Sequence, residues 1–423
     1  MKKHTFIILI FLPIFGFTQV EEEPIEEEID EELIATDTII PEREIYEIEE
    51  VESTEFEEKK PKKWSIDGYI KDLRTAIIDT NGNVYLFNNQ FHNRITFNYY
   101  FNNNWTFKAD LRTQIFYGNL INTGNPLQPF HEGIDGINDD VLDLSLVVVG
   151  KSTLTWYSMF DRLYVDYSND KWNVRVGRQR INWGINTVWN PHDIFNAFSY
   201  FDFDYEERPG SDAVRVTYYT GATSSVEFAV KAFENTDEIV AGGLWKFNKW
   251  NYDFQVLGGV FRKDIVAGLG WAGNIKDIGF KGEASVFQGY DTATTTFAGT
   301  IAFDYAFENS TYVSAGFLYN SLGTAESATT NLLALNIDAK NLFPYKYTGF
   351  GLISYPFNPS ISGALSIIYS PSDDHLLFFN PTLTYTIKDN WNIDLIGQIA
   401  GSMLNKEYRF ASNLMFLRLK WSF

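Results

Sequence analysis

Residues 105–117 read WTFKADLRTQIFY, and their side chains alternate between two kinds of environment. The odd positions, from Trp105 through Leu111 to Tyr117, are nearly all apolar or aromatic. The even positions are mostly polar and include the charged residues Lys108 and Asp110. This period of two is typical of a β-strand whose faces lie in unlike media. Because the charge is central on one face and the rings stand at the ends of the other, the segment predicts a strand between lipid and a water-filled interior.

The same alternation recurs along the chain, for example at 94–101, 214–219 and 415–423. A soluble β-sandwich also alternates, but its strands average about 5–6 residues, whereas tilted membrane-spanning strands need about 9–11. The segments here run to 10–14 residues and therefore favour a transmembrane antiparallel β-barrel. We predict about 18 strands, near 64–75, 90–101, 104–117, 154–167, 171–183, 211–220, 224–233, 238–247, 250–261, 264–274, 277–288, 296–307, 310–320, 344–355, 360–370, 375–387, 390–400 and 411–423.

The connectors between these strands alternate in kind. Four polar turns are each followed by Trp, at 101–105, 169–172, 247–250 and 388–391, and all four follow an even-numbered strand. Asn and Asp suit tight hairpins, and Trp suits a membrane–water boundary. We therefore predict membrane-interface anchors on one rim, and add the C-terminal ring to them: Trp105, Trp172, Trp250, Trp391 and Phe423.

The strand count has one weak point. Residues 141–149, VLDLSLVVV, could extend the fourth strand or form a hairpin of their own, so a count of 16 is the alternative. An even count returns the chain to its starting side, as bacterial single-chain barrels require. The long links 118–153, 184–210 and 321–343 all fall on the rim opposite the Trp turns.

Composition excludes several classes of protein. The 423 residues contain no Cys, which excludes disulfide frameworks and thiolate metal sites. The net charge of −21 argues against a nucleic-acid partner, because such proteins present basic patches. The five His show no metal-ligand spacing and no nucleophile or phosphate-loop motif is present, so we expect no cofactor, no metal and no enzyme activity.

The N-terminal part of the chain differs from the rest. Residues 1–19 have a basic start, an apolar run over 6–17 and a polar exit, the pattern of a signal peptide. Residues 20–63 hold 19 Asp and Glu against 5 Lys and Arg, so we expect a mostly disordered acidic periplasmic tail. Alternatively, Ile25, Ile29 and Leu33 could form one side of a short helix that binds a periplasmic partner. The barrel domain is assigned to 64–423.

Two motifs carry a resemblance to a known family. Residues 175–184, RVGRQRINWG, are followed by 189–196, WNPHDIFN, and the last strand ends in Phe423. This resembles porin-like Gram-negative outer-membrane β-barrels, in which a Gly-Arg-Gln strand leads into a Trp-Gly turn and an Asn-Pro-x-Asp loop. The resemblance implies location in the cell outer membrane, contact with lipid and lipopolysaccharide, and recognition of the C-terminal strand by the barrel-insertion machinery.

The candidate pore residues are charged positions on or beside the predicted inner face. Arg178 and Arg180 would point outward by strict alternation, at a cost of about 2–4 kcal/mol for an Arg at mid-bilayer. We therefore predict a bulge or rotation near Gly177, or a position of these arginines above the acyl-chain zone. We expect a basic wall that favours anions, or else internal pairing of these arginines with Asp110, Asp161 and Asp166. The full set of pore-lining or constriction candidates is Lys108, Asp110, Arg112, Arg162, Arg175, Arg178, Arg180, Arg215, Asp193, Asp202 and Glu206.

The link 184–210 is rich in aromatic and acidic residues. In the porins that this chain resembles, the corresponding loop folds into the lumen and narrows it. So many rings would not stay in water, so we expect them inside the barrel, with Arg175, Arg178 and Arg180 facing Asp193, Asp202 and Glu206. The alternative for the rings is a bound partner.

Together these features predict an outer-membrane channel for passive diffusion of small hydrophilic solutes, with 16–18 strands wide enough for an aqueous lumen. The alternative is a non-enzymatic barrel subunit of a surface assembly, for polysaccharide export or attachment or for protein secretion, with the acidic tail as its periplasmic handle. The sequence leaves oligomer formation open.

Overall fold

The computed structural model describes residues 62–423 except 79–83, 119–139, 152–153, 198–199, 201–203, 205–206, 209, 291–293, 329–336 and 405. The predicted signal peptide and the predicted acidic tail as far as residue 61 lie outside the described residues. Among those described, no helix is long and apolar enough to cross a membrane.

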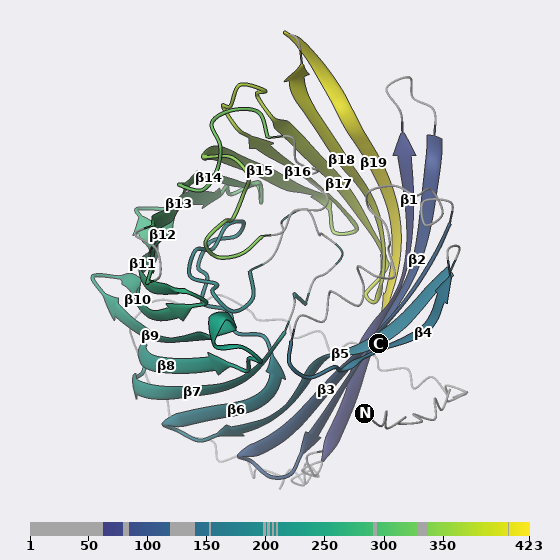
Figure 1. Ribbon diagram of the computed structural model, residues 1–423. Helices are drawn as coiled ribbons and strands as arrows, with labels where there is room; N and C mark the ends of the chain where they lie inside the picture. The colour runs from purple at the N-terminus through teal and green to yellow at the C-terminus, as the bar shows by residue number, and fades with distance from the viewer. Residues whose placement is uncertain are drawn as a thin grey trace, which may run out of the picture. The chain divides into compact units, whose positions relative to one another are not determined.

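The described chain forms one antiparallel sheet that closes on itself (Figure 1). Eighteen strands make the closed wall, as predicted, and a nineteenth, β4, pairs with one of them from the side. The strands are β1 Trp64–Ile78, β2 Val84–Tyr100, β3 Trp105–Gly118, β4 Ser145–Lys151, β5 Leu154–Ser168, β6 Trp172–Gln179, β7 Ser211–Gly221, β8 Ser224–Lys231, β9 Val240–Lys249, β10 Tyr252–Phe261, β11 Asp264–Ile275, β12 Ile278–Gly289, β13 Thr295–Ala306, β14 Tyr312–Asn320, β15 Tyr347–Asn358, β16 Ile361–Tyr369, β17 Leu377–Lys388, β18 Trp391–Leu404 and β19 Glu407–Ser422.

Strand β4 resolves the weak point in the predicted count. It neither extends the following strand nor adds a wall strand, but forms a hairpin with the first part of β5, from Ser145 opposite Met159 to Lys151 opposite Leu154. Strand β6 pairs with the other end of β5, from Leu163 to Ser168. Since β6 is only 8 residues long, β4 occupies the edge of β5 that β6 leaves free.

The barrel closes between its first and last strands. Ten residue pairs join β1 to β19, from Tyr69 opposite Ser422 to Ile78 opposite Asn413. Beyond them Gly68 and Phe423 exchange both backbone hydrogen bonds at 2.9 Å. The Phe423 ring lies 3.1 Å from where a Cβ on Gly68 would stand, so this Gly allows the close approach.

The rim that carries both ends of the barrel has the predicted Trp turns. In two of them the Asn side chain accepts backbone N–H groups, Asn102 from Trp105 and Asn169 from Trp172. The rings then pair with Tyr on the neighbouring strand: Trp105 lies 4.9 Å from Tyr167 between ring centroids. The third turn differs from the prediction, because Trp250 itself occupies the turn with φ of 56° instead of following it.

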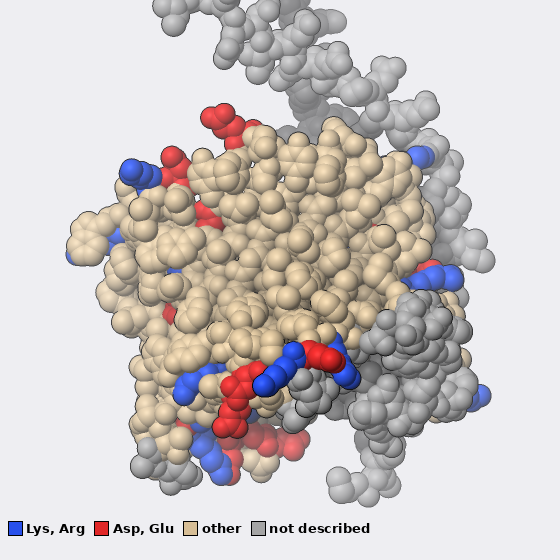
Figure 2. All heavy atoms as spheres, turned by 90° about the horizontal axis from the view of Figure 1, so that it is seen from above, with Lys and Arg blue, Asp and Glu red and all other residues tan. Residues whose placement is uncertain are grey.

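Inner and outer faces alternate along each strand. The outer positions are largely Ile, Leu, Val and aromatic residues, many of them exposed. Figure 2 shows this on one side of the barrel, where charged side chains gather at the two edges and leave a broad uncharged band between them. Such a band between aromatic rims is typical of a barrel wall in contact with lipid.

Several inner positions are apolar and buried, because connecting segments fold inward over them. One cluster joins Trp183 and Phe195, which follow β6, to Leu244, Phe261 and Phe287 on β9, β10 and β12. A second joins Trp189 and the segment 342–345 to inner residues of β13–β17. The hydrophobic core therefore lies inside the barrel, between the wall and these loops.

Candidate functional site

The link after β6 enters the lumen sooner than predicted. The strand was expected to continue to 183, but it ends at Gln179, whose amide nitrogen donates to the backbone oxygens of Arg175 and Ala213. Gly177 has a φ of +119°, but both neighbouring strands pair through it without a register shift, so the predicted bulge is not observed there. A Cβ there would stand 2.2 Å from the Leu163 oxygen, so the position requires glycine.

A single carboxylate on the inner wall holds the first part of this loop. Glu283 of β12 is 1% exposed, and one of its oxygens accepts the N–H groups of Ile185 and Asn186, the latter at 2.9 Å. Its other oxygen accepts the N–H of His192 at 3.1 Å. Three backbone donors of one loop thus converge on one buried acid.

Two further contacts reinforce this attachment. The side chain of Trp183 donates to Glu227 of β8 at 2.5 Å, while its backbone N–H donates to Asp193 within the loop at 2.7 Å. Burial raises the pKa of Asp193 to about 6, against the lowering effect of the hydrogen bonds from Trp183 and Gly184. Asp193 therefore stabilises the conformation of the loop itself.

The middle of the loop packs against a different sector of the wall. The ring of Trp189 lies 6.4 Å from that of Phe350 on β15, and the ring of Tyr200 lies 5.4 Å from the same residue. Trp189 also contacts Phe343, which belongs to the second inward-folded link. The prediction that rings of 184–210 pack inside the barrel is confirmed for Trp189, Phe195 and Tyr200, and Trp183 just before the link packs with Phe195.

The last part of the loop reaches the sector where the barrel closes. Asp204 makes an ion pair with Lys71 of β1 at 3.0 Å and lies 3.3 Å from the His92 ring of β2 and 3.4 Å from Arg418 of β19. Burial alone would raise the pKa of Asp204, but His92, Lys71 and Arg418 together lower it well below the usual range. The loop is therefore tied to the wall at both of its ends.

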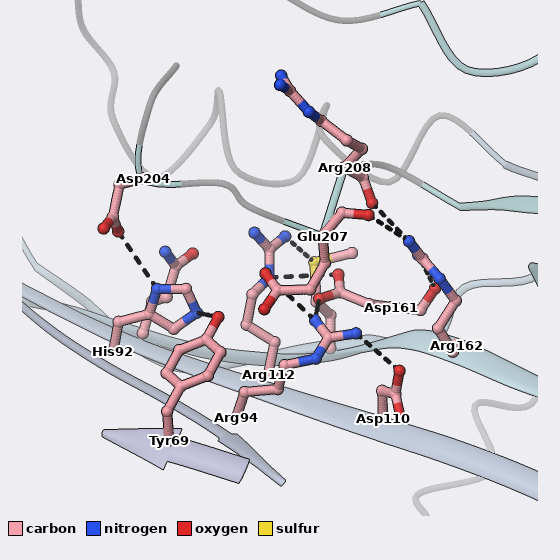
Figure 3. Close-up of polar contacts among 12 residues, drawn as sticks. Tyr69, His92, Arg94, Asp110, Arg112, Asp161, Arg162, Asp204, Glu207 and Arg208 are labelled. Atoms are coloured by element: carbon pink, nitrogen blue, oxygen red, sulfur yellow. Dashed lines mark hydrogen bonds and ion pairs between the residues drawn. The ribbon is translucent and has the colours of Figure 1, made fainter. Parts of the chain in front are cut away.

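Next to this contact, arginines and acids of β2, β3 and β5 form a buried network (Figure 3). Arg94 binds Asp161 at 2.5 Å and Asp110 at 2.7 Å, and Arg112 binds Asp161 at 3.2 Å. Arg162 donates to the backbone oxygens of Glu207 and Arg208 in the loop. Asp161 can reach both arginines because it is the extra residue of a β-bulge in β5, between Phe160 opposite Leu111 and Arg162 opposite Asp110.

Internal pairing, the alternative to a freely exposed basic wall, describes most of the candidate arginines. Arg175 binds Asp166 at 2.6 Å, and Arg178 binds Asp212 at 2.8 Å. The expectation that these two face Asp193 is wrong, because alternation predicts a face of the sheet but no particular partner. Arg180 donates to Asn182 and acts electrostatically on Asp193.

The remaining candidates fall into three groups. Lys108 and Arg215 lie on the inner face and are partly exposed. Asp110, Arg112 and Arg162 are in the buried network just described. Asp202 and Glu206 lie outside the described residues, so their predicted places in the pore stay predictions.

Sequence reasoning missed several residues that hold the site together. Lys71, Arg94 and Glu283 occupy inner positions of correctly predicted strands, and a charge at mid-strand was the signal that could have found them. The inward folding of the link 321–343 was also missed, although Leu342 and Phe343 are adjacent apolar residues in a supposedly exposed loop. In the described part of the chain, no group of His, Asp or Glu could hold a metal ion.

Comparison with solved structures supports the fold. No protein-family model and no curated protein matches the chain. Three similar structures are the outer membrane protein OprD from Pseudomonas aeruginosa (10% identity, TM-score 0.54, covering 85% of this chain and 93% of that one), OccK5 (OpdH) from the same organism (10%, 0.53, 85% and 98%) and OccAB3 from Acinetobacter baumannii (11%, 0.52, 85% and 99%). At this identity the likeness shows that the chain has the barrel fold of these proteins.

Proposed function

We propose that this protein is a passive outer-membrane channel for small hydrophilic solutes, narrowed by the loop that follows β6. The observation that carries the proposal is the attachment of this loop to well-separated sectors of the inner wall, at Glu283, Phe350 and Lys71. A loop held in this way crosses the lumen and divides it. The fold shared with the outer membrane protein OprD supports the location and the class of function.

The charges around the lumen are unevenly placed. Among the described strand residues, the arginines at inner positions lie on β2, β3, β5–β7 and β19, whereas the inner positions of β13–β17 are mainly Thr, Ser, Gly and apolar residues. Since most of these arginines are paired with acids, the positive and negative charges on this side of the lumen nearly cancel. This side therefore produces an electric field across the lumen more than a net positive potential. We infer that the channel favours polar solutes that carry separated charges over simple anions.

Three partly exposed cations are the best candidates to contact a passing solute. Lys108 lies 3.7 Å from Asp110, Arg175 pairs with Asp166, and Arg215 donates to Asn173. Each side chain keeps part of its surface open to the lumen, unlike Arg94. These three cations, rather than the whole predicted set, are proposed as the solute-facing basic residues.

Reconstitution of the full chain into planar bilayers and liposomes tests this function. We expect stepwise single-channel currents and swelling of liposomes in solutions of small sugars or amino acids. The variant Arg175→Ala with Arg215→Ala should change the ratio of anion to cation permeability, whereas Lys249→Ala at the turn rim should not. Absence of conductance from folded, inserted protein would refute the proposal.

A further inference from the structure

Polar residues form a patch on the outer face of the barrel, where lipid is expected. On β1 the buried inner residues are Tyr69, Lys71 and Leu73, so Asp72 and Arg74 point outward. They pair with each other, with Arg74 Nε 3.1 Å from Asp72 Oδ2. The Arg74 side chain is 60% exposed and the Asp72 side chain is 33% exposed. No inner charge or loop of the lumen is involved.

The patch continues across the neighbouring strands. Asn93 of β2 lies opposite Thr113 of β3, which lies opposite Ser158 of β5, and the two hydroxyls are 2.9 Å apart. Asn89 lies opposite Arg74. All are at outward positions by the alternation of their strands. We define the outer polar patch as Asp72, Arg74, Asn89, Asn93, Thr113 and Ser158.

The register places this patch inside the apolar band and away from its edges. Asp72 lies opposite Leu419 and Arg74 opposite Leu417 on β19. These two leucines stand between the outer rings of Trp421 at one rim and Phe410 at the other. An ion pair at this depth is costly against hydrocarbon. The neighbouring polar groups are paired within the chain: Asn93 and Asn89 donate to backbone oxygens of Tyr69 and Tyr117, and the hydroxyls of Thr113 and Ser158 bond to each other.

The rest of the outer face shows how unusual the patch is. Among the described strand residues at outward positions between the rims, the other charged pair is Arg178 and Asp212. That pair is 2–3% exposed, because the backbone of Leu142 donates to Asp212 and accepts from Arg178. The chain itself therefore covers one outward ion pair and leaves Asp72–Arg74 uncovered.

We propose that the outer polar patch is an interface at which a second copy of this chain binds about a two-fold axis. Its chemistry is self-complementary: one acid beside one base, surrounded by amides and hydroxyls that both donate and accept. In a two-fold interface the same patch meets itself, so Asp72 of one copy can face Arg74 of the other and the reverse. Each copy then removes the ion pair of its partner from lipid. The interface is independent of the lumen, so it goes beyond the proposed channel function.

Charge exchange between copies tests the proposal. The full chain in lipid nanodiscs should have the light-scattering mass of two chains. Asp72→Arg alone and Arg74→Asp alone should each weaken dimerisation at least tenfold. In a dimer of either variant, residues 72 and 74 carry the same charge, so two pairs of like charges face each other across the interface. Co-expression of the two variants with different tags should restore a mixed dimer, because every pair across the interface is then opposite in charge. Unheated gel migration checks that each variant is folded.

Single-cysteine variants give an independent measurement, because the natural chain has no Cys. Oxidation should join two copies of Asn93→Cys or Thr113→Cys, but not of Ala267→Cys on the outer face of β11. A monomeric wild type, a dimer that Asp72→Arg leaves intact, or single variants that mixing does not rescue would each overturn the proposal. The monomeric variants should keep their conductance, which separates this result from failure of the channel function.

Discussion

Removal of the Glu283 carboxylate should release the first part of the inward-folded loop. Glu283 accepts the N–H groups of Ile185, Asn186 and His192, and no other acceptor replaces it when it becomes Ala. A typical intramolecular hydrogen bond contributes about 0.5–1.5 kcal/mol, and a buried donor left unpaired costs about 1–3 kcal/mol. Because the released loop can regain water from the lumen, we take about 1 kcal/mol for each bond.

The sum of about 3 kcal/mol corresponds to a shift of about 100-fold in the ratio of attached to detached loop. The loop remains tied through Asp204 and Trp183, so we expect local detachment of 184–192 and an intact barrel. In planar bilayers, Glu283→Ala should show larger open-channel current noise and more frequent conductance steps than the wild type. Hydrogen exchange at the amides of Ile185, Asn186 and His192 should accelerate in proportion.

Two control variants separate the loss of the acceptor oxygens of Glu283 from the loss of any acid on the inner wall. Glu283→Gln keeps one acceptor oxygen for Ile185 and Asn186 but loses the bond from His192, so its effect should be intermediate. Asp304→Ala removes an acid from the next strand, where it binds Lys281 at 2.9 Å and not the loop, so its noise should match the wild type. Unchanged exchange at the three amides in Glu283→Ala would refute the assignment of Glu283 as the anchor.

Three further predictions concern stability, each measured by urea unfolding in lipid vesicles. Because the pKa of Asp193 is raised to about 6, the folded state binds the proton of this carboxyl more tightly than the unfolded state does. The free energy of unfolding should therefore be higher by about 1 kcal/mol at pH 5 than at pH 7. Asp193→Asn should abolish this difference. Asp161→Asn should destabilise the barrel by about 3–5 kcal/mol, since Arg94 and Arg112 both lose a buried partner, and equal stability would show that Asp110 and Glu207 compensate. Gly177→Ala should cost about 1–3 kcal/mol because of its positive φ, whereas Gly258→Ala, with open space around its Cβ, should stay within about 0.5 kcal/mol.

The wall of the barrel could be predicted because its cause is local. Each strand has apolar side chains on its outer face and mostly polar ones on its inner face, so apolar and polar residues alternate along the sequence with a period of two. Strand β3 begins one residue after its predicted start, β11 begins at its predicted start, and β17 begins two residues after its predicted start. The prediction failed at 180–183, where Ile181 and Trp183 alternate like a strand but bury their side chains against other inner residues.

The partners of the charged residues could not be predicted for the same reason. Alternation assigns Arg175 and Arg112 to a face, but their partners depend on register and on bulges. A single extra residue at Asp161 in β5 decides that Arg94 and Arg112 share one acid. The anchors Glu283 and Asp204 are more than 75 residues apart in sequence, and only the path of the loop across the lumen relates them.

The apolar inner residues of β12–β16 explain how such a wide barrel can hold a narrow path. In an open, water-filled lumen, Phe287, Leu318 and Ile368 at inner positions would be exposed to water, yet each is fully buried. They are stable there because the two inward-folded links place Trp183, Trp189 and Phe343 against them. Apolar inner positions thus mark where loops attach, and polar inner positions mark where water remains. By that criterion we propose that a solute passes along the surface left by Lys108, Arg175, Arg215 and the facing hydroxyls, and we expect substitutions there to change selectivity without loosening the loop.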